Sequence, residues 1–118
     1  MSVAVSLSDL PAQVSRFGLG PYLVTVAADG TPRATSIAVS WHGDALMAGL
    51  GRRTSANVRG NGAVTLLWPA PAPGDYALIV DGSAVVEDAP GGGASVVISP
   101  ARAVLHVTRD GPRGAQPG

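Results

Sequence analysis

Cysteine and lysine are both absent from this sequence of 118 residues, and each absence excludes a group of functions. Without cysteine the chain can form neither a disulfide nor a thiolate metal site. Without lysine it has no Schiff-base nucleophile and no lysine for a Walker phosphate-binding loop. The two histidines, His42 and His106, are isolated from each other, so we expect no metal site. An anion that binds this chain must therefore be held by arginine, hydroxyl or backbone N–H groups.

Charged and aromatic side chains are also scarce. Charged residues make up 14% of the chain and aromatic residues 4%, and eight basic residues balance eight acidic ones. Nucleic-acid-binding modules normally carry a basic excess and aromatic rings for stacking, so we expect no nucleic-acid partner. No stretch has the ~20 consecutive apolar residues of a membrane-spanning helix, and the first residues lack the pattern of a signal peptide. We therefore expect no membrane segment and a cytoplasmic location.

The apolar residues make up 46% of the chain and are mainly alanine, valine and leucine. Such residues in short runs separated by turn residues are typical of β-strands. We predict an all-β fold, an antiparallel β-barrel of about six strands with one or two short helices. The chain length suits one domain, which we place at residues 1–109, followed by a disordered tail at 110–118.

The strands are predicted from the order of apolar runs and turn signals. Runs at 22–28 and 32–41 flank Asp29-Gly30, a pair typical of a hairpin with a type I′ turn. Together with a run at 45–50 they predict a three-stranded meander. Asp81-Gly82 interrupts a later run and fits either a tight hairpin or a β-bulge. The remaining strands are expected at 63–68, 76–86, 95–98 and 102–107.

One helix is expected before the first of these runs. Leu7, Leu10, Val14 and Phe17 recur at helical spacing, and Gly18 follows as a stop signal. A second helix of about two turns is expected after the run at 45–50.

The one dense polar cluster is Arg52-Arg53-Thr54-Ser55, at the start of the second expected helix. Thr54 or Ser55 could cap that helix, which would end at a glycine near position 60. Free N–H groups at a helix start favour an anion, and two guanidinium groups with two hydroxyls would complete a phosphate site. The alternative is that the hydroxyls only cap the helix and the arginines are solvated.

The order of these features resembles the pyridoxamine 5′-phosphate oxidase-like flavin-binding split barrels, a group that includes proteins using the deazaflavin F420. The resemblance covers residues 7–107. Three segments carry it. The family's opening hairpin is similar to VAADGTPRATSIAVSW, and its strand–turn–helix–strand unit is similar to LMAGLGRRTSANVRGNGAVTLLWP. Its long strand with a central glycine is similar to LIVDGSAVV. The resemblance implies an antiparallel split β-barrel that forms a homodimer, with FMN at the dimer interface.

The family's phosphate site lies at the turn after the third strand. By position, this role falls on Arg52, Arg53 and Thr54, with Ser55 next to them. The resemblance implies a small flavin-dependent oxidoreductase whose substrate is unknown, and it singles out no catalytic side chain.

The family's flavin ring is contacted by the second strand and the end of the third. By position, the second-strand contacts fall on Thr35, Ser36 and Ile37, and the third-strand contacts on Met47 and Ala48.

Three positions depart from the oxidases of this family. Those enzymes have a basic residue where Thr35 stands, threonine where Ala48 stands and lysine where Thr54 stands. Each lost charged contact of about 1.5–3 kcal/mol would weaken flavin binding tenfold or more. The Arg-rich C-terminal segment that reads the oxidase substrate is not found either, so we do not expect a pyridoxamine phosphate oxidase.

Two alternatives to an FMN protein stay open. An F420-binding reductase of the same fold would place the polyanionic tail of its cofactor on Arg52, Arg53 and Arg59. A binding or structural dimer that has lost its cofactor would also be compatible with the three departures.

Overall fold

The computed structural model describes residues 1–88, 91 and 93–107 of the chain. In chain order its elements are β1 (Ser2–Val5), α1 (Leu10–Phe17), β2 (Tyr22–Val26), β3 (Pro32–Ser36), β4 (Ser40–His42), β5 (Ala45–Leu50), α2 (Arg52–Gly60), β6 (Ala63–Trp68), β7 (Ala77–Asp88) and β8 (Ala94–His106). The predicted tail at 110–118 lies outside the described residues.

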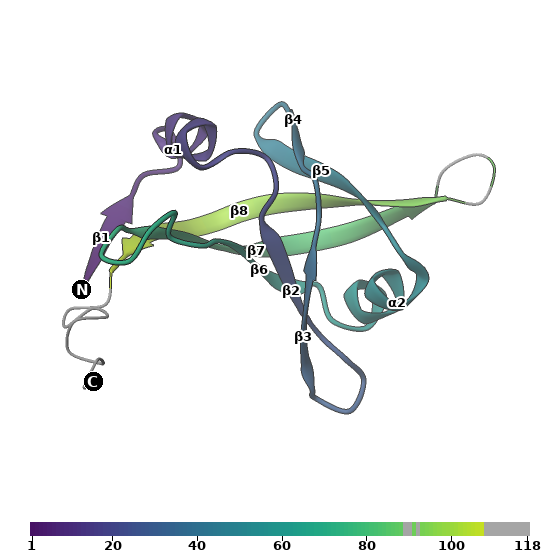
Figure 1. Ribbon diagram of the computed structural model, residues 1–118. Helices are drawn as coiled ribbons and strands as arrows, with labels where there is room; N and C mark the ends of the chain where they lie inside the picture. The colour runs from purple at the N-terminus through teal and green to yellow at the C-terminus, as the bar shows by residue number, and fades with distance from the viewer. Residues whose placement is uncertain (89–90, 92, 108–118) are drawn as a thin grey trace.

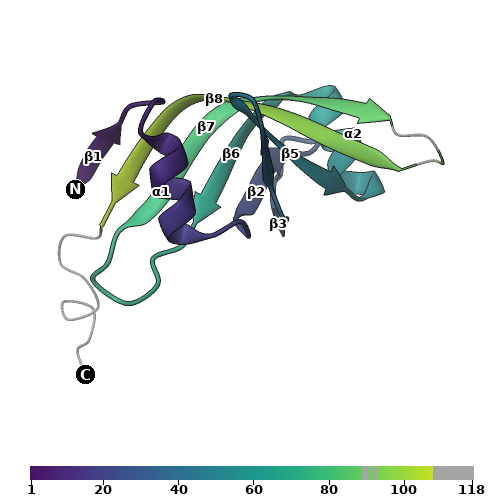
Figure 2. The ribbon, with the colours of Figure 1, turned by 90° about the horizontal axis from the view of Figure 1, so that it is seen from above.

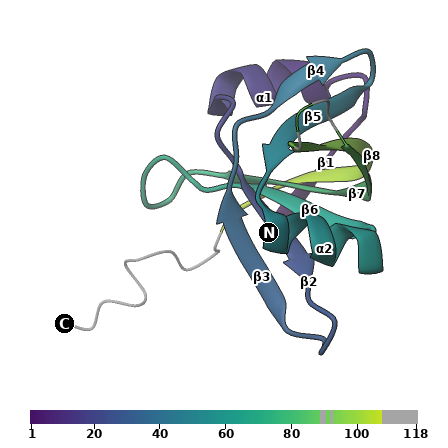
Figure 3. The same ribbon diagram turned by 90° about the vertical axis from the view of Figure 1, so that its right-hand side faces the viewer.

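The strands form one antiparallel sheet in the order β3-β2-β6-β7-β8-β5-β4, and β1 pairs with β8 beside this path (Figure 1). β7 and β8 are the longest strands and run side by side along the molecule, as the view from above shows (Figure 2). The two helices lie toward opposite ends of the sheet (Figures 1 and 2), and the view along the molecule shows α1 at the top and α2 below it (Figure 3). Neither of them is long and apolar enough to cross a membrane.

The two ends of the sheet, β3 and β4, are consecutive in the chain. Only residues 37–39 separate them, and this link is bonded to the segment between α1 and β2. The N–H of Ile37 donates to the carbonyl of Pro21, and the N–H of Val39 donates to that of Leu19, at 3.0 and 2.9 Å. Because so short a link joins both sheet edges, the sheet has to curl around its core, which confirms the predicted barrel.

The described residues form eight strands rather than the predicted six or so. The run at 32–41 is divided into β3 and β4, because the chain leaves β2 after Ser36 and pairs with β5 from Ser40 onward. The predicted three-stranded meander is therefore wrong, since β5 pairs with β4 and β8 and not with β3. β1 was missed because four mostly exposed residues show no clear alternation.

The β2–β3 hairpin forms as predicted, but its turn is of another kind. Gly30 has a φ of 85°, whereas no non-glycine residue in the described part of the chain has a positive φ, so Asp29 cannot be half of a type I′ turn. The N–H of Gly30 donates to the carbonyl of Ala27, which is the pattern of a type I turn followed by a left-handed glycine. Hydrogen bonds from Thr31, first its side chain and then its backbone N–H, lower the pKa of the Asp29 carboxyl and reinforce the turn.

The barrel interior is filled almost entirely by leucine and valine. α1 buries Leu10 and Val14 in it and ends, as predicted, at Gly18, whose φ is 97°. Among the described residues, Trp68 is the one aromatic side chain that is fully buried in the core, and its Nε1 donates to the carbonyl of Gly18 at 2.6 Å. This bond joins the end of β6 to the end of α1.

β7 is continuous through Asp81-Gly82, so the hairpin alternative at this point is wrong and the bulge is confirmed. The register shifts there: Asp81 lies opposite Arg102, and Gly82 lies opposite Pro100, which leaves Ala101 of β8 as the extra residue. Pro100 is tolerated because β5 pairs with β8 only as far as Ile98, so the missing N–H faces no partner strand.

Gly82 allows the close approach of the two long strands at the bulge. A Cβ at this position would lie 2.5 Å from the carbonyl oxygen of Ser99, a backbone atom that cannot move aside alone. We predict that Gly82→Ala lowers the free energy of unfolding by about 1–3 kcal/mol, as overpacking usually does.

Urea denaturation of the two proteins measures this difference. The matched control is Gly49→Ala, in β5, where a Cβ would meet no atom within 4 Å. A Gly82→Ala midpoint equal to that of Gly49→Ala would show that the crossing at the bulge imposes no steric constraint.

Candidate functional site

α2 begins directly after β5, with only Gly51 between them. Gly51 is the N-cap residue, in extended conformation, and no side chain among the described residues caps the helix. The predicted cap by Thr54 or Ser55 is therefore wrong, because the helix begins two or three residues earlier, at Arg52. The polar cluster thus lies within the first turn of the helix, where the N–H groups of Arg52, Arg53 and Thr54 have no acceptor inside the helix, whereas that of Ser55 donates to the Gly51 carbonyl.

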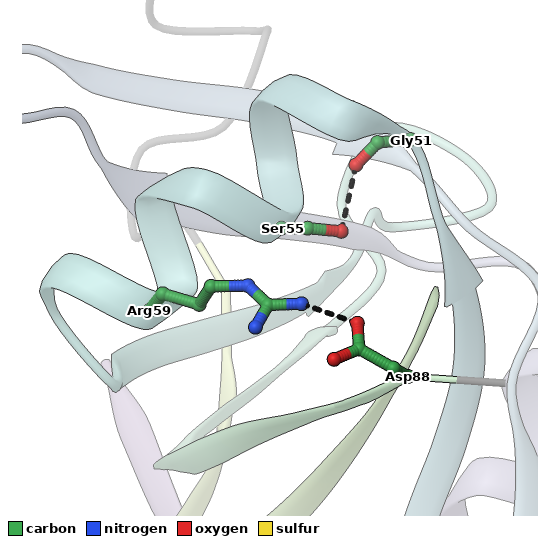
Figure 4. Close-up of polar contacts among 4 residues, drawn as sticks. All are labelled: Gly51, Ser55, Arg59 and Asp88. Carbon is green, nitrogen blue, oxygen red and sulfur yellow. Dashed lines mark hydrogen bonds and ion pairs between the residues drawn. The ribbon is translucent and has the colours of Figure 1, made fainter. Parts of the chain in front are cut away.

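The Ser55 hydroxyl is turned into its own helix. It donates to the Gly51 carbonyl at 2.8 Å, and the residue is only 6% exposed (Figure 4). Its one O–H is therefore used within the protein, whereas Arg52 and Arg53 are exposed and Thr54 is half-buried.

A groove of about 490 Å³ lies between α2 and the ends of β5, β7 and β8. Arg52, Ser55, Ala56 and Arg59 line its helical wall, because residues three, four and seven positions apart share one face of a helix. Arg53, one position on from Arg52, does not line the groove. The opposite wall is formed by Leu50, Asp88, Gly93 and Ala94.

The groove contains an ion pair that the sequence did not reveal. Arg59 Nη2 lies 2.6 Å from Asp88 Oδ1, and their side chains are 50% and 76% exposed (Figure 4). Asp88 follows Glu87 at the end of β7, and two adjacent carboxylates at a strand end are usually both solvated. The partners are 29 positions apart, on α2 and on the last residue of β7, so no local pattern could have paired them.

α2 is held on the barrel independently of that ion pair. Val58 is buried in the core, and the Asn57 side-chain amide donates to the hydroxyl of Thr25 at 3.2 Å. Thr25 lies on β2 and is 1% exposed, so this bond satisfies a polar group inside the barrel.

The predicted ring contacts on β3 do not share one face of the sheet. Thr35 lies opposite Leu23, which is fully buried, whereas Ser36 lies opposite the exposed Tyr22. Since residues directly opposite each other point to the same side, Thr35 faces the core and Ser36 faces outward. Ile37 follows in the link to β4 and packs against the core.

The two candidates on β5 are divided in the same way. Ala48 is buried in the core, and Met47 lies opposite Val97 and Ser40 on the outer face. Ser36 and Ser40 flank the link at 37–39 and Ser40 pairs with Met47, so Ser36 and Met47 both lie near this link, on the outer face. β3 and β5 share no strand pairing in the part of the chain that the structure describes.

The outer face of the sheet is largely apolar. One outward row of side chains crosses four neighbouring strands and consists of Tyr22, Leu67, Ile79 and Val104. A second outward row contains Val85, Val97 and Met47, and Val85 is 65% exposed.

A polar cluster lies between the two rows. The Thr65 hydroxyl donates to the Asp81 carboxylate at 2.7 Å, and Arg102 lies 3.8 Å from the same carboxylate. The cluster carries one acid and one base, so its net charge is zero.

No protein-family model matches the chain. Two curated relatives, uncharacterized proteins of Mycobacterium bovis and Mycobacterium tuberculosis, are each 44% identical to it over 59 residues. The match covers 48% of this chain and 42% of each relative, so the chain matches less than half of their length.

Solved structures align over much more of the chain. A candidate pyridoxamine 5′-phosphate oxidase from Listeria innocua superposes with a TM-score of 0.72, at 18% identity, over 87% of this chain and 100% of that protein. The fold is a pyridoxamine 5′-phosphate oxidase-like split barrel. The split barrel that the sequence predicted is thereby confirmed.

Other solved structures that superpose on this chain are named for other cofactors. An F420 reductase superposes with a TM-score of 0.59 at 24% identity, over 72% of this chain and 88% of that protein. A heme-binding protein from Mycobacterium smegmatis superposes with a TM-score of 0.69 at 11% identity, over 92% of this chain and 57% of that protein. At such identities the likeness establishes the fold, and the cofactor has to be argued from the residues of this chain.

Proposed function

We propose that this split barrel binds a flavin-type cofactor, with FMN as the first candidate, and acts as a small oxidoreductase. The proposal rests on the first turn of α2. There Arg52 lines the groove and Arg53 is exposed beside it, and no side chain among the described residues caps the helix. Unpaired N–H groups and guanidinium groups together favour a phosphate. Proteins named as a candidate pyridoxamine 5′-phosphate oxidase and as an F420 reductase share the fold, which supports this class of cofactor.

The first turn of α2 fits a phosphate in charge and in donor chemistry. Arg52 and Arg53 supply two cations that stay protonated at any physiological pH, and the Thr54 hydroxyl adds a neutral donor. Ser55 contributes mainly by holding the first turn together through Gly51.

The remaining proposed contacts would orient the cofactor ring. Ser36 and Met47 lie on the outer face and are suited to contact the ring directly. The side chains of Thr35, Ile37 and Ala48 face or pack against the core, so these residues would contribute through their backbone or by packing under the site. A bound flavin would supply the electron transfer, and this chain would bind and orient it and restrict access of water. We assign no catalytic side chain.

F420 is the second candidate because of Arg59. This residue places a second guanidinium in the groove, on the same helical face as Arg52, where a longer anionic tail could reach it. The structural likeness to an F420 reductase supports the same alternative.

We further propose that the protein is a cytoplasmic homodimer that pairs through the outer face of its sheet. The apolar rows around Ile79 and Val85 would be covered in such a dimer. Asp81 and Arg102 supply both signs of charge, so two copies of the same surface can match each other across a two-fold axis. A cofactor site on the outer face beside Ser36 and Met47 would then be completed by the second copy.

The cofactor proposal predicts retained flavin and a dependence on the arginines. After incubation with FMN and desalting, the protein should keep a flavin absorption spectrum, and Arg52→Ala or Arg53→Ala should raise the Kd for FMN about ten- to a hundredfold, because each removes a charged contact. Fluorescence titration with FMN and, side by side, with F420 measures both affinities.

The control is Arg16→Ala, which removes the same charge from α1 at the other end of the molecule. If Arg52→Ala and Arg53→Ala both bind FMN as tightly as the parent chain, the phosphate assignment is wrong. Binding of F420 alone would favour the second candidate, and binding of neither would leave a cofactor-free dimer.

The dimer proposal predicts that a charge on the outer face separates the subunits. Val85→Glu places a carboxylate in the apolar row and should weaken dimerisation at least tenfold, measured by sedimentation velocity, with little effect on folding because the side chain is exposed. Leu19→Glu, at an exposed residue outside the sheet, is the matched control. A parent chain that stays monomeric, or a Val85→Glu chain that dimerises as tightly as the parent, would contradict the proposal.

A further inference from the structure

The groove beside α2 has two cationic ends that differ in one respect. Arg52, at the start of the helix, has no ion-pair partner among the described residues, whereas Arg59, at its end, is paired with Asp88 at 2.6 Å (Figure 4). Seven residues at 1.5 Å of rise separate the two arginines by about 10 Å along the helix axis. The Arg59 guanidinium is held by Asp88 and that of Arg52 is not, so the two ends are separate binding positions.

The Arg59–Asp88 pair is not needed to hold the fold together. Its side chains are half and three-quarters exposed, and ion pairs between such exposed groups contribute little to stability. The helix is already anchored by Val58 and by the bond from Asn57 to Thr25. A ligand with a suitably placed negative charge can therefore compete with the Asp88 carboxylate for Arg59 without disturbing the fold.

Asp88 also occupies a position from which it would oppose such a ligand. It is the last residue of β7 and lines the groove directly across from α2. Its neighbour Glu87 is on the opposite face of the strand, since successive side chains alternate. Asp88 is thus the one acidic side chain lining the groove in the described part of the chain.

We propose that Asp88 is a specificity-determining residue that occupies the Arg59 end of the groove and so favours a cofactor with a single phosphate over one with a longer polyanionic tail. This inference rests on the proposed function, because it assumes that the groove receives the anionic part of the cofactor. A monophosphate at Arg52 leaves the Arg59–Asp88 pair intact. A ligand with a second anionic group about 10 Å further along the helix must separate the pair and then lies against the Asp88 carboxylate.

The test compares FMN and F420 binding to the parent chain, Asp88→Asn, Arg59→Gln and the double variant. Asparagine keeps the shape of the side chain and removes its charge. We expect Asp88→Asn to lower the Kd for F420 about five- to tenfold while changing that for FMN less than twofold, and the gain to disappear in the Arg59→Gln background. The gain should also shrink at high salt, because the groups are exposed.

Glu87→Gln is the matched control, since it removes the same charge one residue away on the other face of β7, and it should leave the ratio of the two affinities unchanged. If the parent chain binds FMN but Asp88→Asn changes both affinities equally or not at all, the role of Asp88 is overturned while the proposed function stands. If no variant binds either cofactor, both are overturned. A gain in F420 affinity confined to Asp88→Asn with an intact Arg59 supports the inference.

Discussion

The three-residue link between β3 and β4 is the constraint on which the rest of the structure depends. These strands are the two edges of the sheet, and the four Cα–Cα steps from Ser36 to Ser40 can span at most about 14 Å. The sheet must therefore curl until its edges meet. The link is fixed in turn by backbone bonds from Ile37 and Val39 to the segment after α1, and the Val39 side chain is buried in the core. Closure, core packing and the position of α1 are thus coupled at one point.

The curvature also determines where the candidate site lies. The bulge opposite Gly82 bends the long β7–β8 hairpin, and the ends of β5, β7 and β8 then meet α2 around one groove. The helix starts only one residue after β5, so Arg52 has no freedom to move away from this groove. Anion-binding groups are therefore positioned by strands and a helix rather than by a long loop, which suits a site that must orient a cofactor.

Local patterns predicted most of the elements, and long-range pairing explains what they missed. The end of α1 at Gly18, the whole of β5 and the end of α2 near Gly60 follow from nearby residues. The division of the run at 32–41 depends on which strands the chain pairs with, and the Arg59–Asp88 pair depends on two segments 29 residues apart, so neither has a local signal. The resemblance to split barrels predicted the fold correctly because it depends on the order of features along the chain. It could not reveal that Thr35 and Ala48 face the core while Ser36 and Met47 face outward.

The central claim, that the first turn of α2 receives the phosphate of a cofactor, is tested most directly by following backbone amide resonances in a ¹H–¹⁵N NMR titration with FMN. We expect the largest shifts at the N–H groups of Arg52, Arg53 and Thr54, with smaller shifts around Met47 and Ser36. Shifts that leave the start of α2 unchanged and gather instead at the α1 end of the barrel would contradict it. The N–H groups report the contact themselves, so the result does not depend on any substitution.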